Sequence, residues 1–178
     1  MKRVISGSDN ALAVVRGLLT VGGLGTWDDL LSFMDRALSS REDLMNGAAQ
    51  RGQCLCGAVT YEATSLGTAT HCHCKMCQRA SGSPFMTWVD TTEEHFRLLS
   101  GSPVERKSSE DGIRSFCPGC GSQLFMRYEG EPTIGISVGT LDDATSIVAD
   151  HNIWTKSRLP LMKGFDCDLE DFPRSSEE

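Results

Sequence analysis

The pattern of apolar and polar positions changes its period about fifty residues into the chain. Between Trp27 and Leu38, apolar residues recur every three to four positions, which is the spacing of one face of an α-helix. Thr26 can cap this helix, and Asp29 stands three residues later, where an acidic side chain can accept a hydrogen bond from the amide of the capping residue. We therefore expect a short helical N-terminal extension over residues 1–50. Its apolar stripe either packs on the rest of the protein or binds a partner, and packing is favoured because such stripes usually face their own core.

After Gln53 the apolar residues alternate with polar ones, as they do on half-buried β-strands. The alternating apolar residues are Val59, Tyr61 and Ala63, then Phe96 and Leu98, then Leu124, Met126 and Tyr128, and finally Ile134, Ile136 and Val138. Glycines separate these runs, as expected of turns between short strands. The pattern predicts a mainly β, largely antiparallel domain over residues 51–173, followed by an acidic tail over residues 174–178.

Composition and charge argue against two classes of partner. With 178 residues, 39% of them hydrophobic and 23% charged, the chain is large enough for a folded domain with its own core. A net charge of −7 provides no basic surface for nucleic acid. The most apolar segment, residues 11–25, is interrupted by Arg16 and lacks a signal-peptide cleavage pattern. We therefore expect a cytoplasmic protein with no nucleic-acid or membrane partner.

Cysteine spacing favours metal binding over disulfides. The chain has eight cysteines, and all but one fall into three short groups: Cys54 and Cys56; Cys72, Cys74 and Cys77; Cys117 and Cys120. Cysteines two or three residues apart are poorly placed to bridge each other but well placed to hold one ion. The remaining residue, Cys167, stands alone between two aspartates, and we interpret it as incidental.

The Cys-Pro-Gly-Cys segment from Cys117 to Cys120 is typical of a zinc knuckle, because its Pro and Gly force a tight turn that points both thiolates at one ion. A knuckle needs two further ligands. Cys54 and Cys56 can supply them, because residues i and i+2 of an extended segment lie on one face. The spacing therefore predicts a closed structural zinc site of four thiolates, which would contribute directly to folding.

The remaining group, Cys72, Cys74 and Cys77, then has no obvious fourth ligand. Zinc held by three protein ligands keeps a position open for water or substrate, which is typical of catalytic sites. His71 or His73 could close the site instead, but in an extended segment each would point away from the adjacent cysteines. We therefore predict two Zn²⁺ ions per chain, one structural and one catalytic. His73 is the candidate for catalytic proton transfer, and the alternative is a surface histidine bonded to backbone.

Four segments resemble the glutathione-dependent formaldehyde-activating enzyme family, which also includes centromere protein V. They are GQCLCGAVTYEA, HCHCKMCQRASGS, FCPGCGSQLF and VGTLDD. The order of their cysteine motifs is highly specific to that family, and the likeness runs from about Gly52 to Pro173. It implies the family's mainly β, zinc-bearing fold, called a β-tent. It also implies the same division of the cysteines into four structural and three catalytic ligands.

The resemblance implies a zinc-dependent carbon–sulfur lyase of the S-(hydroxymethyl)glutathione synthase type. Its partners would be a small thiol such as glutathione and an aldehyde or its adduct. Lys75 and Arg79 could meet a glutathione carboxylate, although solvated charges are the more common role. Trp154 looks like a common aromatic of the family, which lines the pocket or packs in the core, and residues 139–142 would form a turn near the site. The alternative function is a non-catalytic zinc-binding interaction module.

Overall fold

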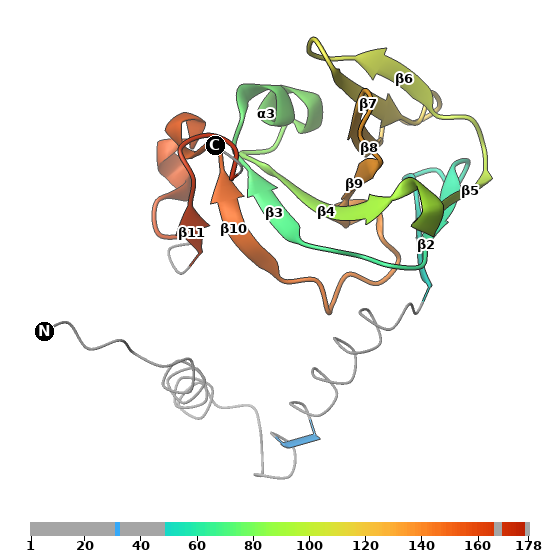
Figure 1. The fold of residues 1–178 in the computed structure, drawn as a ribbon, viewed down its shortest axis with the longest axis horizontal. Helices are drawn as coiled ribbons and strands as arrows, with labels where there is room; N and C mark the ends of the chain where they lie inside the picture. The colour runs from blue at the N-terminus through green and yellow to red at the C-terminus, as the bar shows by residue number, and fades with distance from the viewer. Residues whose placement is uncertain (1–30, 33–48, 166–168, 177–178) are drawn as a thin grey trace, which may run out of the picture. The chain divides into compact units, whose positions relative to one another are not determined.

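The described part of the chain is mainly β, as the alternating pattern predicted. The structure is a computed structural model that describes residues 31–32, 49–165 and 169–176 (Figure 1). Residues 31 and 32 are helical. The rest of the predicted N-terminal helix lies outside the described residues, as does Cys167.

The described residues form short strands, one complete α-helix and several single 3₁₀ turns. The strands are β1 (Gln50–Gln53), β2 (Thr60–Ala63), β3 (Ala69–Cys72), β4 (Met86–Thr92), β5 (Phe96–Ser100), β6 (Val104–Lys107), β7 (Gly112–Phe116), β8 (Gln123–Tyr128), β9 (Thr133–Ser137), β10 (Ala149–Ile153) and β11 (Glu170–Asp171). The helices are α3 (Lys75–Ser81) and the 3₁₀ turns η1 (Glu93–His95), η2 (Val138–Thr140), η3 (Thr155–Ser157) and η4 (Pro160–Met162).

These strands make two sheets. The smaller sheet has the order β1-β2-β5, and the larger one has the order β11-β10-β3-β4-β9-β8-β7-β6. All pairs are antiparallel except those of β10 with β3 and with β11, which are parallel. Parallel neighbours need a long crossover connection, and here the chain forms α3 and most of the larger sheet before β10 returns beside β3. The sequence pattern does not reveal this long return, so it predicted a largely antiparallel domain without the parallel pairs of β10.

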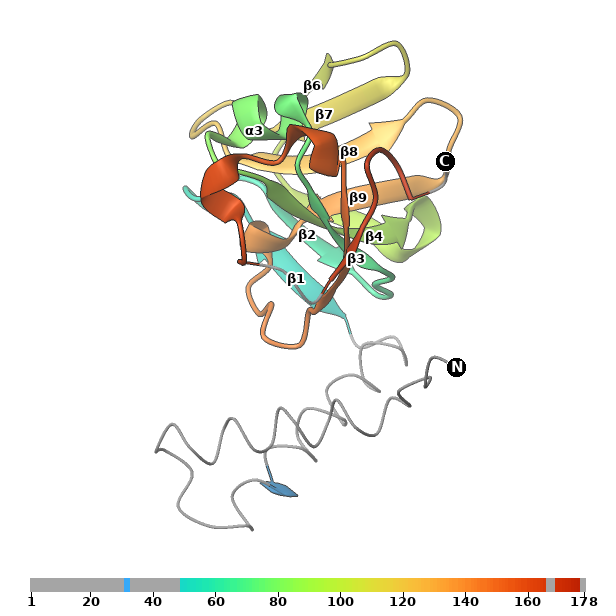
Figure 2. The same cartoon turned by 90° about the vertical axis from the view of Figure 1, so that its left-hand side faces the viewer.

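One face of the larger sheet packs against the smaller sheet to make the main apolar core (Figures 1 and 2). The ring of Tyr61 on β2 is fully buried and meets Phe125 on β8 edge-on, with ring centroids 4.9 Å apart. Val89 on β4 faces this core, while its neighbour Trp88 faces the opposite side. That opposite side of the sheet, together with α3, holds a second buried cluster rich in cysteine.

Most of the residues that alternation predicted on strands lie on strands in the structure. Ile134 and Ile136 are buried on β9, whereas the predicted continuation at Val138 already belongs to the 3₁₀ turn η2. Leu98 is 39% exposed because β5 is an edge strand of the smaller sheet. Alternation therefore predicted β2, β5, β8 and β9 but not how much of each strand is covered.

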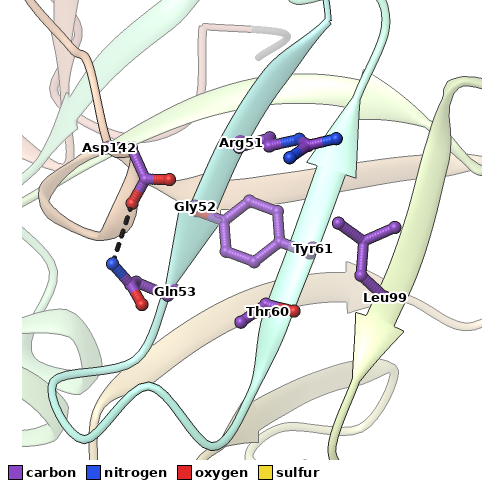
Figure 3. A pocket seen from close by; sticks show the side chains of 7 residues that line it. All are labelled: Arg51, Gly52, Gln53, Thr60, Tyr61, Leu99 and Asp142. Carbon is purple, nitrogen blue, oxygen red and sulfur yellow. Dashed lines mark hydrogen bonds between the residues drawn. The ribbon is translucent and has the colours of Figure 1, made fainter.

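Gly52 on β1 lies against the Tyr61 ring, which explains why this position has no side chain (Figure 3). A Cβ here would overlap the Tyr61 phenol and lie 2.5 Å from the Thr140 carbonyl oxygen. Neither group can easily move, because Tyr61 is fully buried and its hydroxyl bonds Thr140 Oγ1 at 2.7 Å. We expect Gly52→Ala to lower the free energy of unfolding by about 1–3 kcal/mol, as overpacking of cores typically does.

Gly139→Ala is the matched control for this prediction, since a Cβ at Gly139 would meet nothing within 4 Å. Chemical denaturation of both variants provides the measurement. An equal loss of stability in the two variants would show that close packing at Gly52 is not the cause.

Candidate metal centres

The four cysteines of the predicted structural site come together in the structure. Cys54, Cys56, Cys117 and Cys120 have sulfur atoms that all lie within 4.8 Å of one another. The Cys54 and Cys56 sulfurs are 3.5 Å apart, and the Cys56 and Cys117 sulfurs are 3.8 Å apart. Because Zn–S bonds measure about 2.3 Å, two thiolates of a tetrahedral zinc are separated by about 3.8 Å. The set therefore fits an ion at its centre.

Tight turns at both halves of this cluster aim the sulfurs inward. The Cys54 carbonyl accepts from the Gly57 amide at 2.9 Å, and the Cys117 carbonyl accepts from the Gly121 amide at 2.9 Å. Gly57 and Gly121 have φ of 72° and 75°, a left-handed conformation that glycine adopts without a steric penalty. The amide of Val59 also donates to Cys54 Sγ at 3.3 Å. The glycine after each cysteine pair is thus needed for the turn.

Ser122 connects the two halves of the four-cysteine cluster, a role that the cysteine spacing did not reveal. Its hydroxyl accepts from the Leu55 amide at 3.0 Å and lies 3.2 Å from Cys120 Sγ. The side chain and amide of Ser122 lower the pKa of Cys120 to about 5. A lowered pKa favours the thiolate, the form in which cysteine binds metal.

The other predicted ligands, Cys72, Cys74 and Cys77, also form one cluster, with all sulfur atoms within 4.8 Å of one another. Cys72 ends β3, Cys74 is the N-cap of α3, and Cys77 lies in the first turn of that helix. The Cys74 sulfur caps the helix by accepting from the Cys77 amide at 3.2 Å. The three cysteines are 5%, 8% and 0% exposed, so the cluster is buried.

No fourth ligand completes this cluster within the described residues. No other His, Cys, Asp or Glu there has a ligand atom that lies within 4.8 Å of all three sulfurs. The His71 Nδ1 lies 2.8 Å from the Thr87 hydroxyl, and the His73 Nε2 lies 3.0 Å from Asn152 Oδ1. Both imidazoles therefore have partners other than the cluster. As far as the structure describes the chain, the three-cysteine group is an incomplete coordination sphere.

His73 belongs to a buried polar network that runs toward the C-terminal segment. Its side chain is fully buried rather than on the surface, contrary to the alternative considered from sequence. Asn152 joins it to Asp171, donating to Asp171 Oδ1 at 3.1 Å. Arg158 donates to both oxygens of Asp171, and this hydrogen bonding lowers the pKa of that carboxyl. The network fixes the orientation of the His73 imidazole, and in the sequence His73 stands between two cysteines of the cluster.

Two residues beside the three-cysteine cluster were not predicted from the sequence. Arg114 on β7 donates from Nη2 to Cys77 Sγ at 3.3 Å, and Trp88 Nε1 on β4 lies 3.5 Å from the same sulfur. Hydrogen bonds from Cys72 and Cys74 lower the pKa of Cys77 to about 2, and Trp88 and Arg114 add to this effect. In the sequence Trp88 stands 11 positions from Cys77 and Arg114 stands 37 positions from it, so no local motif connects them.

The sequence model of the family described as glutathione-dependent formaldehyde-activating enzyme matches residues 49–157, more than half of the chain. The chain belongs to this family. The matched segment contains all seven clustered cysteines, which confirms the resemblance drawn from the four sequence segments. Membership supports a glutathione-related, formaldehyde-activating or lyase-like function.

Other comparisons add little to the family assignment. No curated protein matches the chain. A crystal structure of a protein from Rhodobacter sphaeroides is similar at 23% identity, covering 52% of this chain and 87% of that chain, with a TM-score of 0.45. Within residues 31–32, 49–165 and 169–176, no helix is both long and apolar enough to cross a bilayer.

The charged and aromatic residues that the sequence suggested near the site, Lys75, Arg79 and Trp154, are all at least partly exposed. Lys75 and Arg79 are exposed on α3, and the Lys75 ammonium donates to Gln78 Oε1 at 3.0 Å. Trp154 follows β10 with a φ of 58° and is 38% exposed, so its side chain is not part of the closed core. Its neighbour Ile153 packs against the three-cysteine cluster.

The turn that contains the family segment VGTLDD packs on the smaller sheet. The Asp142 amide donates to the Arg51 carbonyl at 2.9 Å, and the Gln53 amide group donates to Asp142 Oδ1 at 3.2 Å (Figure 3). A surface pocket lies here, and Figure 3 shows the residues that line it: Arg51, Gly52, Gln53, Thr60, Tyr61, Leu99 and Asp142. None of them is a cysteine, so this pocket is lined by residues outside both cysteine clusters.

Proposed function

We propose that this protein is a zinc-dependent carbon–sulfur lyase that acts on adducts of glutathione or of another small thiol. The observation that carries the proposal is the buried three-cysteine cluster, to which the described residues contribute no fourth ligand. In this proposal Cys54, Cys56, Cys117 and Cys120 hold a structural zinc and the three-cysteine cluster holds a catalytic one. Membership of the family supports glutathione and formaldehyde as the reactants.

The proposed reaction needs no oxidant or reductant. In the synthetic direction the glutathione thiol loses its proton, its sulfur bonds to the formaldehyde carbon, and the former carbonyl oxygen takes up a proton. The reverse reaction breaks the same carbon–sulfur bond. A zinc ion at the three-cysteine cluster would supply stabilisation of a thiolate at neutral pH or polarisation of a carbonyl oxygen.

Three parts of the proposal concern the chain around this chemistry. His73 remains our candidate for proton transfer, supported by its place between Cys72 and Cys74 and by its fixed orientation against Asn152. Residues 51–173 form the catalytic domain, flanked by an extension at 1–50 and a tail at 174–178. A cytoplasmic location would keep the cysteines reduced and able to bind metal.

The test is a comparison of exchange rates, because glutathione and formaldehyde also combine without an enzyme. Protein of known metal content is added to an equilibrium mixture of the two, and magnetisation-transfer NMR measures interconversion of the free and adduct forms. We expect faster exchange with the wild-type protein than with Cys74→Ser, and a panel of other thiol adducts then ranks substrates. Equal exchange rates for both proteins across the panel would contradict the lyase proposal.

A further inference from the structure

Arg114 is a buried cation whose guanidinium has few hydrogen-bond partners among the described residues. Its side chain is 95% buried, as the residue is 5% exposed. Only Nη2 has a hydrogen-bond partner among the described residues, the Cys77 sulfur at 3.3 Å, whereas Nε and Nη1 have none. The guanidinium also lies 5.6 Å from the centre of the Trp88 ring, which attracts cations through its π face.

The charge of Arg114 has to be balanced by the three-cysteine cluster. A guanidinium stays protonated in proteins, and a buried charge without a partner is strongly destabilising. No described carboxylate forms an ion pair with Arg114, and its hydrogen-bond acceptor is the Cys77 sulfur, a member of the three-cysteine cluster. Three thiolates with one divalent ion carry a single net negative charge, which one guanidinium neutralises.

We propose that Arg114 is a positioning residue that lets the three-cysteine site accept an anionic small-molecule thiolate by offsetting one negative charge, an effect on which a neutral ligand does not depend. The inference rests on the proposed function, since it concerns the ligand of the same site. With Arg114 present, an added thiolate brings the site to a single net negative charge. Without Arg114, the same ligand would create a doubly negative site, and electrostatic repulsion in buried surroundings is strong.

The chain offers a stringent control on the neighbouring strand. Arg106 on β6 is the direct cross-strand partner of Arg114, and it is exposed. Directly opposed residues in an antiparallel pair point to the same face. Arg106→Gln therefore removes the same charge from the same face of the sheet, but at a position where water and salt screen it.

The experiment compares wild-type protein with Arg114→Gln, Arg114→Met, Arg114→Lys and Arg106→Gln, each loaded with Co²⁺ and assayed for metal content. Arg114→Met fills the space beside Trp88 without burying an unpaired polar group, which gives a second variant if Arg114→Gln does not fold. Each protein is titrated at fixed pH with 2-mercaptoethanol, and separately with imidazole as a neutral ligand. The sulfur-to-cobalt and d–d absorption bands report binding.

We expect the Kd for 2-mercaptoethanol to rise about tenfold or more in Arg114→Gln and Arg114→Met. The Kd for imidazole should change by less than about threefold in the same variants. Arg114→Lys, which keeps the charge, should bind the thiol within about threefold of wild type, and Arg106→Gln should match wild type. If Arg114 had only a structural role, its loss would weaken the binding of both ligands alike, and Arg114→Lys would not restore binding.

Two results would overturn the inference, and they can be told apart. In the first, wild-type protein binds the thiol, but Arg114→Gln and Arg114→Met either bind it equally well or show the same rise in Kd for the thiol and for imidazole. The role given to Arg114 is then wrong, and the proposed function stands. If metal-loaded wild-type protein shows no spectral response to any thiol, the proposed function fails and this inference fails with it.

Discussion

Cys120→Ser is expected to give protein that is insoluble or lacks fixed tertiary structure, whereas Cys74→Ser should give a folded but inactive protein. Cys120 belongs to the four-cysteine cluster, which joins segments 61 residues apart through Cys56 and Cys117. Structural zinc contributes roughly 10 kcal/mol or more to the folding of small zinc domains. The free energy lost with one of the four ligands should therefore be comparable to the whole stability of a typical domain, about 5–15 kcal/mol.

Serine is a well-matched replacement at position 74, because Cys74 is the N-cap of α3 and serine is a good N-cap residue. The helix should persist while one of three ligands is lost. Soluble yield, circular dichroism and thermal unfolding compare the two variants, with Cys56→Ser as a second test of the four-cysteine cluster. If Cys120→Ser and Cys74→Ser were equally soluble and gave equal spectra, the assignment of a structural and a catalytic site would be wrong.

A mild chelator is expected to remove about one of two zinc ions per chain and to leave the fold intact. Four cysteines that connect the segment after β1 to the turn between β7 and β8 should hold an ion more firmly than three cysteines from one short segment. A chromogenic chelator measures the ion released, elemental analysis measures the ion retained, and circular dichroism follows the fold. Activity should be lost with the first ion and return when zinc is added back.

Departure of both ions together with unfolding would contradict unequal roles for the clusters. Two ions that both resist the chelator, in a protein without activity on any thiol adduct, would instead favour the non-catalytic interaction module. The second outcome would be consistent with a closed coordination sphere at the three-cysteine cluster. The metal measurement therefore separates the two functional classes before any substrate is known.

The sequence by itself determined the strands β2, β5, β8 and β9 and the composition of both cysteine clusters. Alternation of side chains is a local property of an extended backbone, so Tyr61 with Ala63 and Ile134 with Ile136 could be predicted as buried pairs. Cysteines two or three residues apart are likewise brought together by local turns, here with Gly57 and Gly121 in the left-handed conformation. Their roles as zinc ligands stay predictions.

Only the tertiary structure decided what surrounds the three-cysteine cluster. Arg114 and Trp88 reach Cys77 because β7 and β4 belong to one sheet whose face supports α3, and strand order is not encoded in the spacing of any short segment. The burial of His73 likewise depends on Asn152, which arrives beside it through the parallel pairing of β10 with β3. Contacts between distant segments arise from the packing of the whole domain, and so the charge balance of the site could be read only from the fold.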